Sequence, residues 1–355
     1  MPILKNLSNG LKNTVLGISY LLRRSTKGSL RPKWLVFEVT DRCNSRCTHC
    51  NIWNTPNDKN PITAGEIIKA LSDPLFRDLR YIQITGGEPV LRKDLEEIFL
   101  GIHKVLPKAI LQLSTNALLP DRVLKVVRTS LEAGITIYVG VSIDGIGEEH
   151  DKIRGVKGNF EKADHLLKEL VKLRDKYGSQ LLVSGGIVIS DLTLHSVDPV
   201  RAYAKQIDIE LTEAWYNECS FYGNEGKNDI KSNLTEAILS QTPSPLKDLW
   251  LKDLKGESIR FPCFAMHTFC LLKWSGDIVP CLTHFNSVGG NIRENTPTEI
   301  WNSKQMQDVR VNKVHNCKGC LNSWGAGWSF ETSYYKYVFF YLKNPGFFIK
   351  TLRGK

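Results

Sequence analysis

Three cysteines, Cys43, Cys47 and Cys50, fall within eight residues of the sequence. Thiolates are common protein ligands of soft metals and iron–sulfur clusters, and this C-x3-C-x2-C spacing sets three of them on one short loop. Three ligands leave one iron of a four-iron cluster open, and an open iron can bind and reduce a small molecule. Zinc also accepts thiolate ligands, so a zinc site with an unidentified fourth ligand is the alternative.

A second motif, Gly86-Gly87-Glu88-Pro89, follows the strand-like run Tyr-Ile-Gln-Ile-Thr. Together with the cysteine spacing and His49 before the third cysteine, it resembles the signature of the radical S-adenosylmethionine (SAM) enzymes, which favours the cluster over zinc. The resemblance implies that SAM chelates the open iron. It also implies that an electron from a reductant such as ferredoxin or flavodoxin cleaves SAM to methionine and a 5′-deoxyadenosyl radical. That radical would abstract hydrogen from a substrate or add to it.

The same resemblance implies roles for residues at the ends of later strands. A guanidinium suits the bidentate binding of a carboxylate, so Arg154 in the run Asp-Lys-Ile-Arg-Gly would hold the SAM carboxylate. The other implied cofactor-binding residues would meet the SAM amino group, ribose or adenine: Gly86, Gly87, Glu88, Asn116, Ser142, Asp144 and Gly186.

A second cysteine set lies near the carboxyl end of the sequence: Cys263, Cys281, Cys317 and Cys320. Four thiolates in two pairs make a closed site, which is structural or transfers electrons. The pattern resembles the Twitch module, a shorter relative of the SPASM domain, because no cysteine follows Cys320. We expect one auxiliary [4Fe–4S] cluster on these four residues, and a four-thiolate zinc site is the alternative.

Two cysteines remain outside these sets. Cys270 could replace Cys263 as a ligand, and Cys219 follows the last predicted strand. Cys219, Tyr216 and Tyr222 are the candidate catalytic residues, as donors of a hydrogen atom or as part of the substrate pocket. The alternative is that they are ordinary buried core residues.

Strand-like and helix-like segments alternate after residue 34 and must position these motifs. Repeated β–α units with apolar strands predict a parallel sheet with right-handed crossovers. Six such units match the partial (β/α)6 TIM-like barrel of the resembled family, followed by a small iron–sulfur domain. In parallel barrels the active site gathers at the carboxyl ends of the strands, where the motifs fall. The predicted strands are residues 34–39, 81–85, 110–114, 135–143, 181–189 and 210–216, and the predicted helices are residues 63–72, 93–105, 121–132 (capped by Asp121), 159–177 and 199–206.

The composition is that of a soluble globular protein, with 42% hydrophobic and 24% charged residues in 355. No run of eighteen apolar residues predicts a transmembrane helix. Nine cysteines, several in metal-binding patterns, indicate a reducing compartment. We therefore expect a cytoplasmic protein.

The net charge of +10 comes from the two ends of the chain. Residues 1–37 and 332–355 together carry twelve basic residues and no acidic ones, whereas the body between them carries 35 basic and 37 acidic residues. The near-neutral body argues against a nucleic-acid substrate. Both ends combine apolar or aromatic residues with Lys and Arg, which is typical of docking on an anionic membrane surface, and packing against the barrel is the alternative.

We divide the chain into an amphipathic basic segment (1–33), the barrel (34–231), a connector (232–256), the auxiliary-cluster domain (257–331) and an aromatic basic tail (332–355). The first functional hypothesis is a radical SAM oxidoreductase or transferase acting on a lipid or lipid-linked substrate at the inner membrane face. The second is a maturase of ribosomally made peptides, and the third is a zinc-stabilised binding protein without catalysis. The sequence does not reveal the substrate, the fate of SAM or the oligomeric state.

Overall fold

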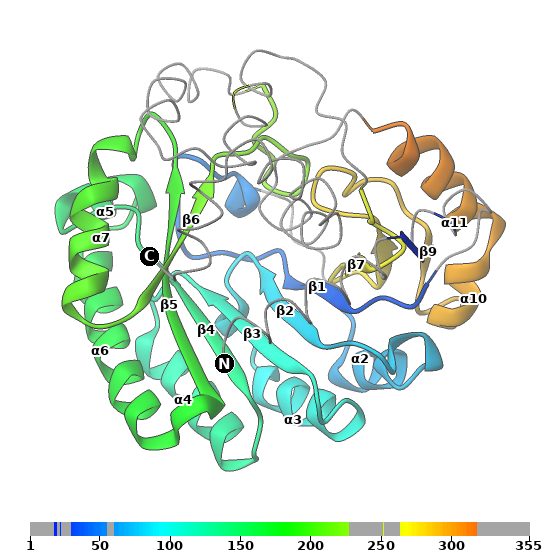
Figure 1. Cartoon of the computed structure of the whole chain (residues 1–355), viewed down its shortest axis with the longest axis horizontal. Helices are drawn as coiled ribbons and strands as arrows, with labels where there is room; N and C mark the ends of the chain where they lie inside the picture. Colours follow the sequence, from blue (N-terminus) through cyan, green and yellow to red (C-terminus); the bar gives the residue numbers. More distant parts are fainter. Residues whose placement is uncertain are drawn as a thin grey trace.

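A single sheet forms the centre of the protein in a computed structural model (Figure 1). The structure describes residues 18, 19, 22, 30–54, 60–226, 251 and 263–317. The sheet has nine strands in the order β6-β5-β4-β3-β2-β1-β7-β8-β9, and it does not close on itself. The aromatic tail, Cys320 and nearly all of the connector and of the basic amino-terminal segment lie outside the described residues.

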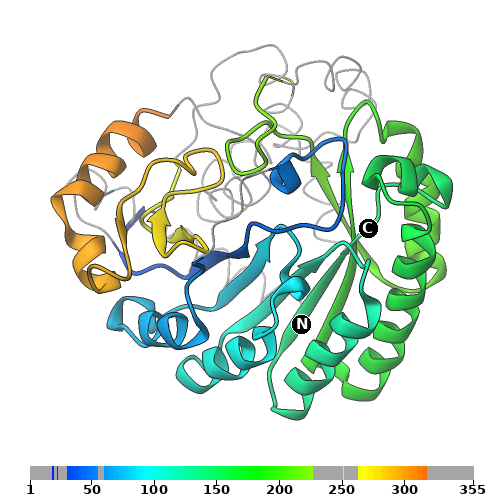
Figure 2. The same ribbon diagram turned by 180° about the vertical axis from the view of Figure 1, so that it is seen from behind.

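The first six strands are parallel and follow the chain from β1 to β6 in order. They confirm the predicted partial barrel. Helices line the outer, convex side of this sheet, and the concave side is left for the strand-end loops (Figures 1 and 2). The strands are β1 (Trp34–Thr40), β2 (Tyr81–Gly86), β3 (Ile110–Thr115), β4 (Ile137–Ser142), β5 (Leu181–Ile189) and β6 (Glu210–Trp215).

The α-helices of the barrel are α2 (Ala64–Leu71), α3 (Leu95–Val105), α4 (Pro120–Glu132), α5 (Glu148–Arg154), α6 (Asn159–Tyr177) and α7 (Val197–Gln206). Short 3-10 turns join them: η1 (Ile52–Asn54), η2 (Pro74–Phe76), η3 (Pro89–Leu91), η4 (Gly178–Gln180) and η5 (Leu194–Ser196).

The carboxyl-terminal part of the described chain extends the same sheet. Strand β7 (Phe269–Leu272) pairs in parallel with β1, and β8 (Asp277–Val279) and β9 (Gly290–Asn291) continue it antiparallel. Helices α10 (Pro297–Asn302), α11 (Lys304–Val309) and the π-helical η7 (Arg310–His315) follow. The main core runs continuously from the barrel into this part, with Trp301 and Met306 buried against it. The cysteine pattern predicted a module here but none of its strands or helices.

The period-two pattern of β1 explains how the two faces of the sheet differ. Leu35, Phe37 and Val39 are fully buried in the core beneath the helices. Trp34 and Val36 alternate with them and line a pocket on the concave side. Strand β1 thus packs in the core with one face and lines the pocket with the other.

Helix boundaries followed their local signals with two exceptions. Thr63 and Glu66 form the predicted capping box at the start of α2. Asp121 was predicted to cap α4, which is wrong: Leu119 is the N-cap, and Asp121 lies in the first turn, where its charge favours the helix dipole. Helix α5, not predicted, ends at Gly155 in the left-handed conformation. None of the described helices is both long and apolar enough to cross a membrane.

Candidate active site

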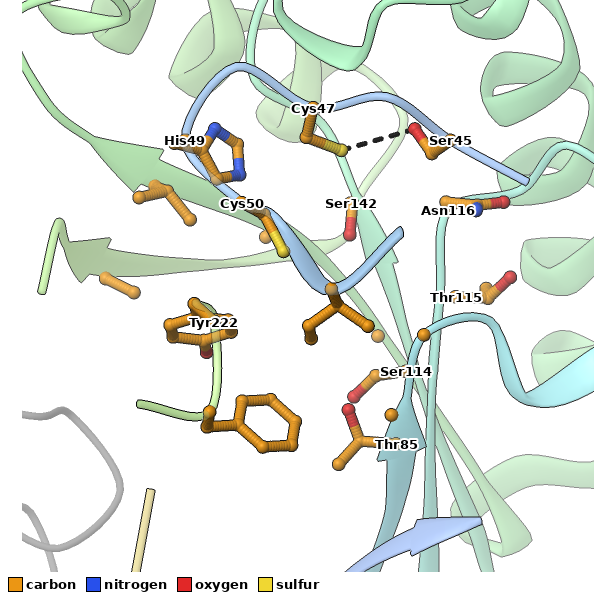
Figure 3. Close-up of a pocket in the computed structure, with 18 of the residues that line it drawn as sticks. Ser45, Cys47, His49, Cys50, Thr85, Ser114, Thr115, Asn116, Ser142 and Tyr222 are labelled. Atoms are coloured by element: carbon orange, nitrogen blue, oxygen red, sulfur yellow. Dashed lines mark hydrogen bonds between the residues drawn. The ribbon is translucent and has the colours of Figure 1, made fainter. Parts of the chain in front are cut away.

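A pocket of about 440 Å³ opens on the concave side of the barrel, at the carboxyl ends of β1 to β6. Cys43, Cys47 and Cys50, on the loop that follows β1, all line it. Figure 3 shows the thiols of Cys47 and Cys50 on the pocket side of this loop. The three predicted metal ligands therefore share one cavity. We call residues 43–54 the cluster loop.

The carboxyl end of α5 holds the cluster loop in place. The backbone N–H of Arg46 donates to the Arg154 carbonyl (3.0 Å), and that of Thr48 donates to the Ile153 carbonyl (2.9 Å). The Ser45 hydroxyl adds a third bond to the Arg154 carbonyl (2.8 Å). The last carbonyls of a helix have no partners within the helix, so the loop supplies them. At Gly155, φ is +67° and an added Cβ would lie 2.5 Å from the Arg46 carbonyl oxygen.

Hydrogen-bonding groups lie close to the sulfurs of Cys43 and Cys47. Cys43 Sγ accepts from the Ser45 N–H (3.4 Å) and lies 3.8 Å from Asn116 Nδ2. Cys47 Sγ lies 3.2 Å from Ser45 Oγ and 3.7 Å from Arg154 Nη1. Donors to sulfur stabilise thiolates and tune cluster potentials, so these residues fit an iron–sulfur cluster.

Burial makes the thiols of Cys43 and Cys50 weak acids in the metal-free protein. It raises the pKa of Cys43 to about 11 and that of Cys50 to about 12. These two thiols are therefore protonated at neutral pH in the absence of metal, and binding of a metal must release their protons.

The two glycines at the end of β2 allow close approach of the backbone between β1 and the cluster loop. A Cβ on Gly86, whose φ is +132°, would lie 2.1 Å from the Thr40 carbonyl oxygen. One on Gly87 would lie 2.0 Å from the Arg42 carbonyl oxygen. Only glycine fits at these positions, because the crowding atoms are backbone. Both glycines also line the pocket, where the motif predicted cofactor contacts.

Glu88 fixes the end of the next strand. Its carboxylate accepts from the Thr115 hydroxyl (2.9 Å) and from the Asn116 N–H (2.7 Å). Only 1% of Glu88 is exposed, and burial raises its pKa to about 7. The Asn116 side chain in turn donates to Asn44 Oδ1 (2.8 Å). Glu88 and Asn116 thus join β2 and β3 to the cluster loop.

Asp144 and Arg154 form a buried ion pair with an O–N distance of 2.7 Å. Burial alone would raise the pKa of Asp144, but the charge of Arg154 holds it below its ordinary value. His49 Nε2 is 4.0 Å from the same carboxylate, and the Val188 N–H donates to its other oxygen (2.9 Å). Arg154 lines the pocket, whereas Asp144 lies behind it.

Most of the predicted cofactor-binding residues surround the pocket. Ser142 and Gly186, in register on β4 and β5, line it with the residues above (Figure 3). Tyr216 and Tyr222 line it from the loop after β6. Cys219 does not: it is 1% exposed and packs in a small apolar cluster with Val36 and other side chains.

Sequence reasoning missed the polar floor of the pocket. Tyr138 on β4 donates its hydroxyl hydrogen to Ser184 Oγ (2.8 Å) and lies 3.4 Å from Thr212 Oγ1. Gln83 donates to Ser114 Oγ (3.0 Å). In the sheet register, Gln112 on β3 lies between Gln83 on β2 and Tyr138 on β4. All of these side chains line the pocket. Polar residues at alternate positions of strands that are otherwise apolar were the available signal.

Three of the four auxiliary cysteines are described. Cys263, Cys281 and Cys317 are each partly exposed, and Cys281 Sγ accepts from the His284 N–H (3.4 Å). Cys270 is instead fully buried on β7, opposite Leu35 of β1. The structure therefore gives Cys270 the position of a core residue. Cys320 lies outside the described residues.

Comparison with known proteins gives the family. The model of the radical SAM superfamily matches residues 37–197, which run from β1 to the start of α7 and contain the pocket-lining motifs. Residues 37–197 are a radical SAM superfamily domain. A second model, SPASM, an iron-sulfur cluster-binding domain, matches residues 263–321 and contains all four cysteines predicted for the auxiliary site. The two matches imply a SAM-binding [4Fe–4S] cluster and auxiliary iron–sulfur binding.

Curated relatives match this chain over different lengths. Fe-coproporphyrin III synthase from Methanosarcina barkeri is 38% identical over 36% of this chain and 31% of its own length. The subtilosin biosynthesis protein AlbA from Bacillus subtilis is 31% identical over 39% of this chain and 30% of its own length. GTP 3′,8-cyclase from Helicobacter pylori is 29% identical over 70% of this chain and 80% of its own length. This chain spans only about a third of the length of four of its curated relatives, which include the Fe-coproporphyrin III synthase and AlbA.

Solved structures share the fold over most of the chain. Streptococcus suis SuiB, bound to its precursor peptide SuiA, covers 84% of this chain and 70% of its own, at a TM-score of 0.60 and 17% identity. The enzyme anSMEcpe, bound to SAM and a peptide, covers 90% of this chain and all of its own, at a TM-score of 0.53 and 19% identity.

Proposed function

We propose that this protein reductively cleaves SAM and directs the resulting radical at a substrate in the barrel pocket. The observation that supports this most is the convergence of Cys43, Cys47 and Cys50 with Arg154 on one cavity at the strand ends. When bound, the cluster supplies the electron that splits SAM into methionine and a 5′-deoxyadenosyl radical. A ferredoxin or flavodoxin is the proposed source of that electron.

The protein's own residues bind and orient SAM in this proposal. The guanidinium of Arg154 faces the pocket beside Cys47, where it would hold the SAM carboxylate. Asp144 keeps that guanidinium in position through the buried ion pair. Glu88 holds Asn116 through its backbone N–H, and both side chains border the space proposed for the amino acid part of SAM.

The auxiliary cluster is proposed on Cys263, Cys281, Cys317 and Cys320. The N–H of His284 directed at Cys281 Sγ supports a thiolate there. The family match over residues 263–321 supports the whole set, including the cysteine outside the described residues.

We propose a peptide as the substrate. Among the described residues that line the pocket, Arg154 is the single Lys or Arg, and Asp144 already neutralises it. A buried triphosphate or several buried carboxylates would need paired cations, since unpaired buried charge is costly. The floor instead offers uncharged hydrogen-bonding groups such as Gln83, Gln112 and Tyr138. These groups suit the amides and neutral side chains of a peptide.

The similar proteins fall into two groups by their names. AlbA acts in the biosynthesis of a bacteriocin, and SuiB was solved with a precursor peptide bound. Other relatives are named for GTP and for coproporphyrin, which are polyanions. The charge of the pocket favours the first group. Tyr216 and Tyr222 are the proposed candidates for a hydrogen donor, since both line the pocket and Cys219 does not.

The lipid hypothesis depends on the two basic ends of the chain, which lie almost wholly outside the described residues. It stays a prediction. Co-sedimentation with anionic vesicles should be lost on deleting residues 1–24 or 334–355. If both deletion variants still co-sediment with the vesicles as the full chain does, the lipid hypothesis is rejected.

The test is anaerobic reconstitution with iron and sulfide, followed by incubation with SAM and dithionite. We expect about eight irons per chain and the formation of 5′-deoxyadenosine. A mixed peptide library should stimulate 5′-deoxyadenosine formation, whereas GTP and coproporphyrin III should not. Stimulation by either polyanion would reject the peptide proposal. Zinc without iron would support the non-catalytic binding protein instead.

A further inference from the structure

One short segment touches both the cluster loop and the carboxyl-terminal part of the sheet. We call residues 217–226, which follow β6, the bridging segment. On one side it receives a hydrogen bond from the Asn51 N–H to the Tyr222 carbonyl (2.8 Å). Asn51 Nδ2 also donates to the Gly223 carbonyl (2.9 Å), and Asn224 Nδ2 donates to the His49 carbonyl (3.1 Å). These bonds fall on the two residues that flank Cys50.

The other side of the bridging segment is bonded next to Cys281. The Phe221 N–H donates to the Leu282 carbonyl (3.2 Å), and Ser220 Oγ donates to the Thr283 carbonyl (2.9 Å). Leu282 and Thr283 directly follow Cys281 in the chain. The bridging segment is therefore hydrogen-bonded beside a ligand of each proposed cluster.

Packing makes this segment a firm connection. The Phe221 ring lies 5.0 Å from Tyr222 and 5.3 Å from Phe285, both edge to face. Phe221 also belongs to the small apolar cluster that includes Cys219, and Cys50 packs against that cluster. A displacement on one side of such a packed unit is transmitted rather than absorbed.

Asn224 is the central hydrogen-bonding residue of the bridging segment. It is 1% exposed, its Oδ1 accepts from the Cys219 N–H (3.0 Å), and its Nδ2 also donates to the Asn217 carbonyl (3.2 Å). One amide thus folds the bridging segment and holds the His49 carbonyl. That carbonyl belongs to the peptide bond joining His49 to Cys50, so Asn224 acts directly on the peptide unit that carries a proposed ligand.

We propose that Asn224 is a positioning residue that fixes Cys50 for cluster and SAM binding, and that the bridging segment links this position to the auxiliary site. The inference rests on the proposed cluster at Cys43, Cys47 and Cys50. Asn224 lines the pocket but acts through the backbone of His49 and Cys50.

The first variant to make is Asn224→Ala, studied in the full-length chain. In the metal-free protein, amide hydrogen exchange in residues 47–52 should become about fivefold faster, the size expected for losing one net hydrogen bond. In the reconstituted protein, the SAM-induced change in the electron paramagnetic resonance (EPR) spectrum of the reduced first cluster should weaken. The auxiliary spectrum should stay as in the unmodified protein.

A matched control separates positioning from general destabilisation. Gln180 Nε2 also donates to two backbone carbonyls, those of Leu131 (2.7 Å) and Ile135 (3.2 Å), at the opposite end of the strands. Gln180→Ala should leave exchange in residues 47–52 and both spectra unchanged. Ser220→Ala removes the bond to the Thr283 carbonyl, together with one to Glu225 within the bridging segment, and should speed exchange in residues 47–52 by about twofold.

Two results would overturn the proposal. One is equal exchange in residues 47–52 and an equal SAM-induced spectral change for Asn224→Ala and Gln180→Ala. The other is a uniform rise in exchange throughout the Asn224→Ala protein, which would make Asn224 a general stability residue. If Ser220→Ala leaves amide exchange in residues 47–52 unchanged, the link to the auxiliary site is rejected. Failure of the unmodified protein to form a SAM-sensitive cluster rejects the proposed function instead.

Discussion

The two cysteine sites of this molecule are built in opposite ways. Cys43, Cys47 and Cys50 lie within eight residues, and hydrogen bonds with α5, with Asn116 after β3 and with the bridging segment hold the loop that carries them. Cys263, Cys281 and Cys317 are spread over more than fifty residues, on either side of a hairpin and two short helices. Hydrogen bonds to its neighbours therefore hold the backbone of the first loop without a metal. The second depends more on the metal to hold its parts together.

The comparison predicts that loss of one ligand at the first site has the largest effect on chemistry. Cys47→Ala should reduce 5′-deoxyadenosine formation by more than about a hundredfold, because even outer-shell partners of metal sites are worth 10- to 100-fold. Product analysis by chromatography after incubation with SAM and dithionite measures it. Cys270→Ala is the control, since Cys270 sits in the core, and it should keep both clusters. Equal activity of the two variants would remove the first site from the mechanism.

The buried ion pair between Asp144 and Arg154 should contribute strongly to the stability of the folded protein. Asp144→Asn leaves the guanidinium of Arg154 buried without its counter-charge, at a cost of about 3–5 kcal/mol in the free energy of unfolding. Urea denaturation of the metal-free protein measures this cost. Asp198→Asn breaks an exposed pair with Arg201 and should change stability by less than about 0.5 kcal/mol. Similar costs for the two variants would show that the buried pair is not a main support.

The contact between α5 and the cluster loop can be isolated with two glycines. Gly155→Ala should cost about 3 kcal/mol, the sum of left-handed strain and a clash with the Arg46 carbonyl, and should lower iron uptake at the first site. Gly158 has a similar left-handed conformation, but an added Cβ there would meet no atom within 4 Å. Gly158→Ala should therefore lower the free energy of unfolding by only about 1 kcal/mol. Thermal unfolding and iron content report both effects. If iron uptake falls equally in the two variants, the α5 contact does not position the loop.

Loss of a ligand at the second site should affect the first site least. Cys281→Ala should lower iron content by about four per chain, because one four-iron cluster fails to assemble. The remaining cluster should still change its spectrum when SAM is added, since most of the bonds around the cluster loop come from the barrel. Loss of all iron from this variant would mean that the two sites assemble as one unit.

The sequence predicted the first half of the molecule well because its signals are local. Alternating patterns set β1 to β6, a capping box starts α2, and glycines at 86 and 87 mark a backbone contact that excludes any side chain. Helix α5 was missed because it is short and its sequence is mostly charged, although its carboxyl end carries the cluster loop.

Non-local features of the site could not be predicted in the same way. Asn224 meets His49 across 175 residues of sequence, and no spacing rule connects them. Strand β7 is placed by pairing with β1, which depends on the assembled sheet. Cys219 followed the last barrel strand as predicted, yet packing turned it away from the pocket. Tertiary contacts decide such cases.

The central claim is that the cluster on Cys43, Cys47 and Cys50 keeps an open iron for SAM. Its most direct measurement is the EPR spectrum of the reconstituted, dithionite-reduced protein before and after addition of SAM. We predict that one cluster signal changes, that the second stays the same, and that the change is lost in Cys47→Ala. Identical spectra with and without SAM, from protein holding both clusters, would contradict it.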